Sequence, residues 1–159
     1  MPSGSCCDAD WIDWRAERLN QFARRLYAEV KRAKPEVIVS AAPSIYPWSK
    51  TNYLQDWPTW VNEGYVDQVC PQVYRDNIAS YRRELIKLAE QVDPEQRHKL
   101  VPGMLVRTAD GYRTSDEMVR KMIAANREQG YAGEVIFYHE ALRHHAEVLR
   151  ECYQQGPQR

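Results

Sequence analysis

The sequence predicts an α/β fold, in which a parallel sheet is covered by helices. Four short segments rich in β-branched residues alternate with amphipathic segments of helical length. Each short segment is apolar almost throughout, as are strands buried on both faces of a parallel sheet. The 159 residues, 43% of them hydrophobic, suffice for one globular domain with a sizeable core.

The chain opens with a predicted amphipathic helix over residues 11–34, which Pro35 ends. Its apolar residues recur at helical spacing, with Arg, Glu and Lys between them: Trp11, Leu19, Phe22, Leu26 and Val30. Residues 37–44 follow as a predicted buried strand, because the run is rich in valine and isoleucine and too short for a helix.

The second strand is predicted over residues 66–74. A loop over 45–55 and a short helix over 56–64 precede it. Trp57 and Trp60 lie three residues apart on the short helix, and we expect both to pack into the core.

Helices and strands alternate over the rest of the chain. A helix over residues 78–92 leads to a strand over 99–106, and a helix over 114–130 leads to a strand over 133–142. The tail of this fourth strand runs into a last helix that reaches about Tyr153.

Local signals refine this pattern. Thr114 and Glu117 have the spacing of a capping box at the start of the helix over 114–130. No internal repeat is detectable, and no strand is followed by the glycine spacing of a phosphate-binding loop. The pattern therefore argues against a nucleotide-binding fold.

Composition and charge argue against two classes of partner. Lys plus Arg and Asp plus Glu number 22 each, so no overall field favours nucleic acid or an anionic membrane. No apolar run approaches the roughly 18 residues that span a bilayer, and residues 1–10 lack the apolar core of a secretory signal. We expect no nucleic-acid binding and no membrane insertion.

Neither a metal site nor a cofactor is predicted. The cysteines are scattered without the paired spacing of zinc ligands: Cys6, Cys7, Cys70 and Cys152. His139, His144 and His145 suggest a metal site, but adjacent histidines on a helix point apart and no acidic partner has the right spacing. We expect these histidines on the solvated surface.

Polar and aromatic side chains gather at the carboxyl ends of the predicted strands, where sites lie in parallel α/β folds. In chain order they are Ser44, Tyr46, Trp48, Gln72, Tyr74, Arg75, Arg107, Tyr138, His139 and Glu140. Side chains two apart share a strand face, so Gln72 is expected beside Tyr74, and Tyr138 beside Glu140. We predict one concave, ligand-facing surface formed by Tyr46, Gln72, Tyr74, Tyr138 and Glu140.

Several of these residues are suited to binding a sugar. Aromatic rings stack on sugar rings through their apolar faces, and the candidates are Tyr46, Trp48, Tyr74 and Tyr138. Gln72 either orients a sugar hydroxyl or satisfies a neighbouring strand end. Asp56 is either the N-cap of the short helix or a substrate contact.

Four stretches of the sequence also resemble one known family. They cover residues 14–35, 40–48, 52–76 and 133–142, and the strongest likeness lies in NYLQDW together with VDQVCPQVYRD. They resemble the C-terminal half of the barrels of the glycosyl hydrolase-like 10 family, over residues 10–145. The resemblance implies strands five to eight of a (β/α)8 TIM-type barrel that cleaves glycan chains, peptidoglycan among them for some members.

The chain departs from the family in its length. A complete barrel needs about 200 to 250 residues or more, and the acidic motif that the family carries after strand four is not in this chain. We expect an unrelated or disordered N-terminus over 1–9, a partial barrel domain over 10–153 and a polar tail over 154–159. Such a fragment is expected to be inactive alone, and a non-catalytic carbohydrate-binding half barrel or a structural fragment remains the alternative.

Glu140 is the candidate catalytic residue. Glycosidases usually place two carboxylates across the scissile bond, about 5 to 5.5 Å apart when retaining and about 6.5 to 9.5 Å apart when inverting. Glu140 alone supplies a carboxylate at a predicted strand end, and a hydrogen-bonding or structural role is its alternative. Asp67 begins its strand and is expected to be a turn residue at the opposite face.

The expected partner is a glycan, with peptidoglycan as one candidate. Four parallel strands leave two edges unpaired, at 37–44 and 133–142, and an inward face uncovered. We therefore expect a homodimer or association with a complementing N-terminal half barrel. We expect no targeting signal in this chain, which leaves its localisation open, and the resemblance implies an exported or envelope enzyme.

Overall fold

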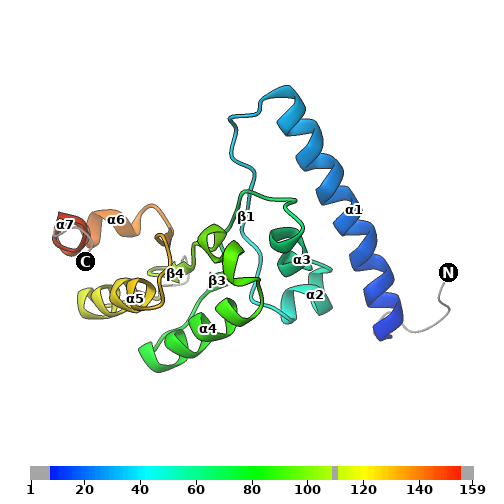
Figure 1. The fold of residues 1–159 in the computed structure, drawn as a ribbon. Coiled ribbons are helices and arrows are strands. Elements are labelled where there is room, and N and C mark those ends of the chain that lie inside the picture. Colours follow the sequence, from blue (N-terminus) through cyan, green and yellow to red (C-terminus); the bar gives the residue numbers. More distant parts are fainter. Residues whose placement is uncertain (1–7, 109–110, 155–159) are drawn as a thin grey trace.

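The computed structural model describes residues 8–108 and 111–154. Within them, helices alternate with short parallel strands, in agreement with the predicted α/β class (Figure 1). The strands lie at the centre, with the long helix α1 (Ala9–Ala33) at one end of the molecule and α7 (Ala146–Gln154) at the other. The predicted N-terminus over 1–9 and the tail over 154–159 fall mostly outside the described residues.

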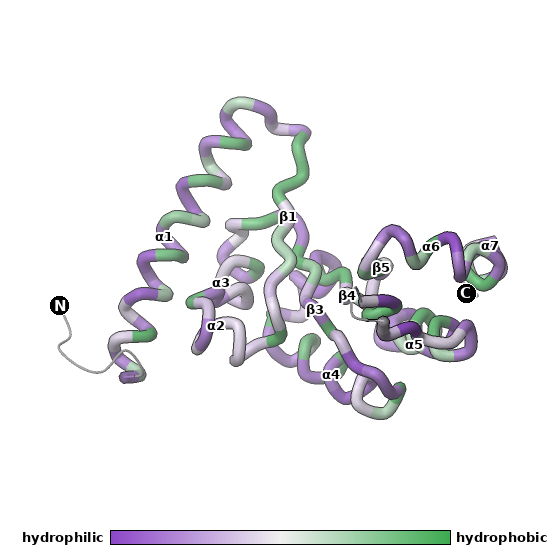
Figure 2. The backbone as a smooth tube through the Cα atoms, turned by 180° about the vertical axis from the view of Figure 1, so that it is seen from behind, coloured by the Kyte–Doolittle hydropathy of each residue, from purple (hydrophilic) through white to green (hydrophobic). Residues whose placement is uncertain are grey.

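Helix α1 begins and ends close to its predicted bounds. Asp8 caps it, because its side chain accepts a hydrogen bond from the Asp10 N–H at 3.0 Å. Figure 2 shows hydrophobic residues recurring among hydrophilic ones along the whole helix. Phe22 and Leu26 of this apolar stripe remain exposed.

All strands run parallel and in chain order. β1 (Ser40–Ala41) pairs with β2 (Gln68–Val69). β3 (Gln72–Val73) pairs with β4 (Gly103–Leu105), which also pairs with β5 (Val135–Phe137). The carboxyl ends of all strands therefore point the same way.

The predicted strand over 66–74 is divided at Cys70 and Pro71, because proline has no N–H for the ladder. Backbone hydrogen bonds continue on both sides of the break. The Cys70 N–H donates to the Ala41 carbonyl at 2.7 Å, and the Gly103 N–H donates to the Pro71 carbonyl at 2.8 Å. The two pieces thus connect β1 to β4.

The prediction of a buried first strand is wrong. Of residues 37–44, only Ser40 and Ala41 pair, and they pair with one neighbour. Val37 is 39% exposed and Ile38 is 67% exposed. An edge strand lacks the second neighbour that would shield it, so an apolar composition alone does not bury it.

The predicted loop over 45–55 contains a short helix, α2 (Trp48–Tyr53), so that part of the prediction is wrong. A helix this short has too few positions to show a 3.6-residue period. The next helix, α3 (Trp57–Asn62), agrees with the prediction, and its Trp57 and Trp60 are buried in the core as expected.

Helix α4 (Ile78–Glu90) follows β3 and begins at Asn77, whose side chain accepts a hydrogen bond from the Ser80 N–H at 2.9 Å. A 3-10 helix, η1 (Pro94–Lys99), then leads to β4. The predicted strand over 99–106 is therefore shorter than expected.

Helix α5 (Asp116–Glu128) has its N-cap at Ser115, one residue after the predicted cap Thr114. Ser115 accepts the hydrogen bond from the Met118 N–H at 3.2 Å, so the capping box at Thr114 and Glu117 is wrong. A hydroxyl in either position suits a cap, and the backbone conformation decides between them.

The predicted fourth strand over 133–142 ends early. β5 stops at Phe137, and a short helix, α6 (Ala141–His144), occupies its expected tail before α7 begins. His145, between the two helices, is 8% exposed, and its Nδ1 lies 2.5 Å from Asp116 Oδ1. The prediction of a solvated His145 is therefore wrong, whereas His139 and His144 are exposed.

The core lies on one face of the sheet. Val69, Val73 and Met104 are buried there, and helix α4 packs against α5, which packs against α7. On the opposite face, Val135 is 41% exposed and Phe137 is 42% exposed. A parallel sheet is usually covered on both faces, so the face that carries Val135 and Phe137 is open in this chain.

Asp67 lies in a bend directly before β2, as predicted for a turn residue at the start of its strand, and it also makes contacts that the sequence did not reveal. Its carboxylate accepts hydrogen bonds from the Tyr27 hydroxyl at 2.8 Å and from the Val39 N–H at 2.8 Å, and Lys31 Nζ lies 2.7 Å away. Tyr27 and Lys31 belong to α1, so this one carboxylate ties that helix to the start of the first two strands.

The described residues contain no group of three or more His, Cys, Asp or Glu side chains placed to hold a metal ion. Cys70 and Cys152 are free thiols, while Cys6 and Cys7 lie outside the described residues. None of the described helices is both long enough and apolar enough to cross a membrane.

Candidate functional site

Three aromatic side chains form a row at the carboxyl ends of the strands. The ring centroids of Tyr74 and Phe137 lie 5.2 Å apart, and those of Phe137 and Tyr138 lie 5.5 Å apart. The His139 ring continues the series, 5.7 Å from that of Tyr138. We call Tyr74, Phe137 and Tyr138 the aromatic row.

The aromatic row crosses strand β4, which has a glycine, Gly103, near the Tyr74 ring. Tyr74 follows β3 and Phe137 ends β5, with β4 between them. A Cβ added to Gly103 of β4 would lie 3.5 Å from Cε1 of Tyr74. The Tyr74 ring therefore lies close to the backbone of β4 at Gly103.

Arg107 and Glu140 meet beside this row. Arg107 Nη1 lies 3.5 Å from Glu140 Oε2, and the Tyr138 hydroxyl donates a hydrogen bond to the same oxygen at 3.3 Å. Both distances are long for such contacts, and the Glu140 side chain is 52% exposed. The carboxylate is therefore oriented by two neighbours but remains open to a ligand. We call the aromatic row, Arg107 and Glu140 together the strand-end surface.

The strand-end surface offers groups that can form hydrogen bonds to a ligand, among them the Tyr74 hydroxyl and the Glu140 carboxylate. Burial raises the pKa of Tyr74, so its hydroxyl stays protonated and can donate or accept a hydrogen bond at neutral pH. Within the described part of the chain, Glu140 contacts Arg107 and Tyr138, and no second carboxylate joins them. Glycosidases usually use two carboxylates, and among the described residues this surface presents one.

Two other predicted site residues lie away from the strand-end surface. Tyr46 packs its ring edge-on against Trp57 at 6.3 Å, and its carbonyl accepts a hydrogen bond from Gln91. Trp48 is exposed on α2 and packs edge-on against Tyr53 at 4.9 Å. Figure 1 places α2 and α3 on the opposite side of the central strands from α6.

Asp56 and Gln72 are engaged with their own neighbourhoods. Asp56 occupies the N-cap position of α3 but makes no capping hydrogen bond, and its carboxylate lies 3.5 Å from Lys50 Nζ. Gln72 Nε2 donates a hydrogen bond to the Ala42 carbonyl at 2.8 Å, which satisfies the neighbouring strand end. The structure therefore brings together Tyr74, Tyr138 and Glu140 from the predicted set.

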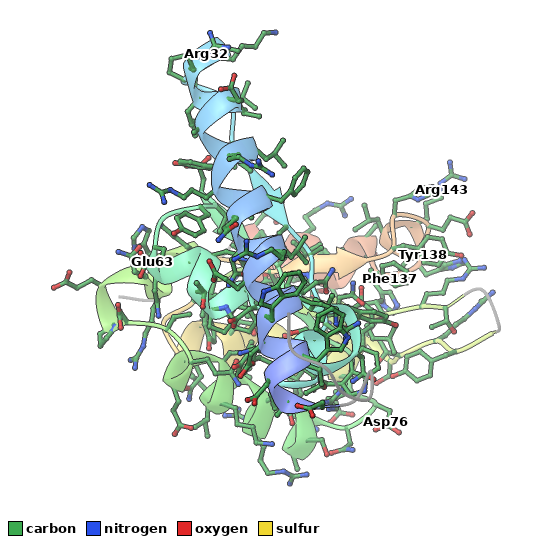
Figure 3. The ribbon with its side chains drawn as sticks, turned by 90° about the vertical axis from the view of Figure 1, so that its right-hand side faces the viewer. Arg32, Glu63, Asp76, Phe137, Tyr138 and Arg143 are labelled. Atoms are coloured by element: carbon green, nitrogen blue, oxygen red, sulfur yellow. The ribbon has the colours of Figure 1, made fainter. Side chains whose placement is uncertain are left out.

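Sequence reasoning missed Phe137 as a site residue and did not single out Arg107 among the strand ends. Phe137 lies in an apolar strand, where a phenylalanine is expected to be buried. Its exposure follows from the open face of the sheet, which no local pattern reveals. In Figure 3, Phe137 and Tyr138 lie on the same side of the molecule as Arg143 of α6, away from Arg32 and Glu63.

Known proteins share sequence and fold features with this chain. The family model described as glycosyl hydrolase-like 10 matches residues 2–111 of the chain. The fold is similar to that of the PgaB (BpsB) glycoside hydrolase domain from Bordetella bronchiseptica, with a TM-score of 0.69 and 15% sequence identity. That similarity covers 90% of this chain and 43% of the other, so the chain spans less than half the length of that domain. None of the curated proteins matches the chain.

Proposed function

Because this chain belongs to the glycosyl hydrolase-like 10 family, we propose that its strand-end surface binds a glycan. We propose further that its strands correspond to strands five to eight of a TIM-type barrel. The chain order of the parallel strands and the 43% coverage of a glycoside hydrolase domain support this assignment. In such barrels, ligands bind at the carboxyl ends of the strands, where the strand-end surface lies.

The observation that carries the proposal is the aromatic row beside the Arg107–Glu140 pair. The rings of Tyr74, Phe137 and Tyr138 offer apolar faces against which a sugar ring stacks. The Tyr138 hydroxyl, the Arg107 guanidinium and the Glu140 carboxylate lie next to these rings and suit hydrogen bonds to sugar hydroxyls. One small surface thus combines both kinds of contact that a saccharide uses.

Cleavage needs a second carboxylate, about 5 to 5.5 Å or about 6.5 to 9.5 Å from the first. We propose that Glu140 is one of the pair and that the other comes from outside the described residues, supplied by a complementing half barrel. The described chain then binds glycan without cutting it. A purely carbohydrate-binding role is the second candidate, and the presence of one carboxylate at this surface favours it.

Glycan binding is tested by titrating the full chain with neutral β-linked oligosaccharides of increasing length, and by co-sedimentation with denuded peptidoglycan. Phe137→Ala removes one ring of the row and should weaken binding by about three- to tenfold, the range that ring stacking supports. Phe22→Ala is the matched control, because Phe22 is also an exposed phenylalanine but lies on α1. Absence of binding by the wild type, or equal losses in both variants, would overturn the proposal.

A further inference from the structure

The strand-end surface continues into a pocket of about 340 Å³ with an unusual lining. Its five lining residues are Arg107, His139, Glu140, Arg143 and His144. Arg107 follows β4, and the others come from α6 and the segment that joins it to β5. We call this the basic pocket.

The charges in the basic pocket do not cancel. With both histidines neutral, two arginines and one glutamate leave a net charge of +1, while the whole chain is neutral. Arg107 has Glu140 as an ion-pair partner at 3.5 Å and lies 3.4 Å from His144 Nε2. Among the described residues, Arg143 has no ion-pair partner and is exposed. An unneutralised guanidinium therefore remains available to an anion.

The basic pocket adjoins the aromatic row. The Tyr138 hydroxyl donates to Glu140 Oε2, and the Tyr138 ring packs against that of His139, so one residue touches two of the pocket's lining residues. Figure 3 shows Arg143 on the same side as Phe137 and Tyr138. A saccharide ring stacked on the row would hold its substituents next to the pocket.

We propose that the glycan bound at the strand-end surface carries a carboxylate, as a uronic acid does, and that the basic pocket binds this carboxylate. The inference rests on the proposed function. Guanidinium groups donate paired hydrogen bonds to planar carboxylates. A single negative charge matches the net charge of +1 on the pocket lining.

The test compares three β-linked disaccharides that differ in one group: one ends in glucose, one in glucuronic acid and one in glucose 6-phosphate. Titration of the full chain in low salt should show the acid binding about fivefold more tightly than the neutral sugar, the scale of an exposed charge contact. The preference should shrink at high salt, because salt screens exposed charges. Tightest binding of the phosphorylated sugar would overturn the assignment to a carboxylate.

Two variants should change the preference for the acidic over the neutral disaccharide in opposite directions. Arg143→Gln should remove it while binding of the neutral disaccharide is retained, and Glu140→Gln should enlarge it, because the lining then carries a net charge of +2. Arg24→Gln is the matched control, since it removes one exposed positive charge from α1, and it should keep the wild-type preference.

The outcomes separate this inference from the proposed function. Equal affinity for the acidic and neutral disaccharides, or a preference that survives Arg143→Gln, would overturn the inference and leave glycan binding intact. Failure to bind any of the disaccharides or longer oligosaccharides would overturn both.

Discussion

Tyr74 reaches Phe137 across the intervening strand β4, and their ring centroids lie 5.2 Å apart. Leu105 of β4 is in register with Phe137, and Gly103, two residues earlier, lies close to the Tyr74 ring. A side chain on Gly103 would touch both the Tyr74 ring and, more tightly, the Pro71 carbonyl oxygen.

Gly103→Ala should lower the free energy of unfolding by about 1 to 3 kcal/mol, the usual cost of overpacking. The added Cβ would lie 3.1 Å from the Pro71 carbonyl oxygen, which is backbone and cannot move freely, and 3.5 Å from the Tyr74 ring. Urea denaturation measures the effect, and glycan affinity should fall with it. Gly133→Ala is the control, because a Cβ there meets nothing within 4 Å. Equal stability of the two variants would contradict the prediction.

Asp67→Asn should destabilise the protein by about 1 to 3 kcal/mol at pH 7, the scale of hydrogen bonds to a charged group. Burial alone would raise the pKa of Asp67, but hydrogen bonds from Lys31, the Val39 N–H and Tyr27 outweigh it and hold that pKa below its ordinary value. The contribution is therefore present above the unfolded-state pKa of about 3.9 and is lost as pH falls through the lower folded-state pKa.

The measurement for Asp67 is urea denaturation at several pH values between 2 and 7. The variant should lose less stability than the wild type below pH 4, because the ionised group is gone. Glu63→Gln serves as the control, since Glu63 projects from the surface in Figure 3. An Asp67 variant as stable as this control at pH 7 would show that the contact to α1 is weak.

The purified chain should associate as its concentration rises. The edge strand β1 leaves Ile38 67% exposed, and the open face of the sheet exposes Val135 and Phe137. Light scattering at several concentrations should give a mass above 18.6 kDa, and Ile38→Lys should reduce it, because it replaces an exposed apolar side chain beside the edge strand β1 by a charge. Tyr53→Lys, on exposed α2, is the control. A mass near 18.6 kDa at every concentration would reject association.

The isolated chain should show no measurable turnover of denuded peptidoglycan or of β-linked oligosaccharides. One carboxylate cannot act as acid and as the opposite base or nucleophile in the same step. Product analysis by mass spectrometry checks this, with Glu140→Gln beside the wild type. Turnover by the wild type that disappears in Glu140→Gln would show that the chain already holds a complete acid pair.

The sequence by itself determined the features that depend on local pattern. Helices α1, α4 and α5 have a continuous 3.6-residue period, and each begins within two residues of its expected start. Tyr138 and Glu140 could be assigned to one site from their position after an apolar strand. Such signals depend only on residues that are close in sequence, so they can be recognised without knowledge of the fold.

Only the tertiary structure decided which apolar residues are covered. Ile38 and Phe137 have the composition of buried strand residues but lie exposed, because β1 has one neighbouring strand and one face of the sheet has no covering layer in the described chain. His145 shows the reverse, since packing next to Asp116 buries a residue that its sequence context places in solvent. Whether a side chain is buried depends on the residues that pack against it, and these residues are often far away in the sequence.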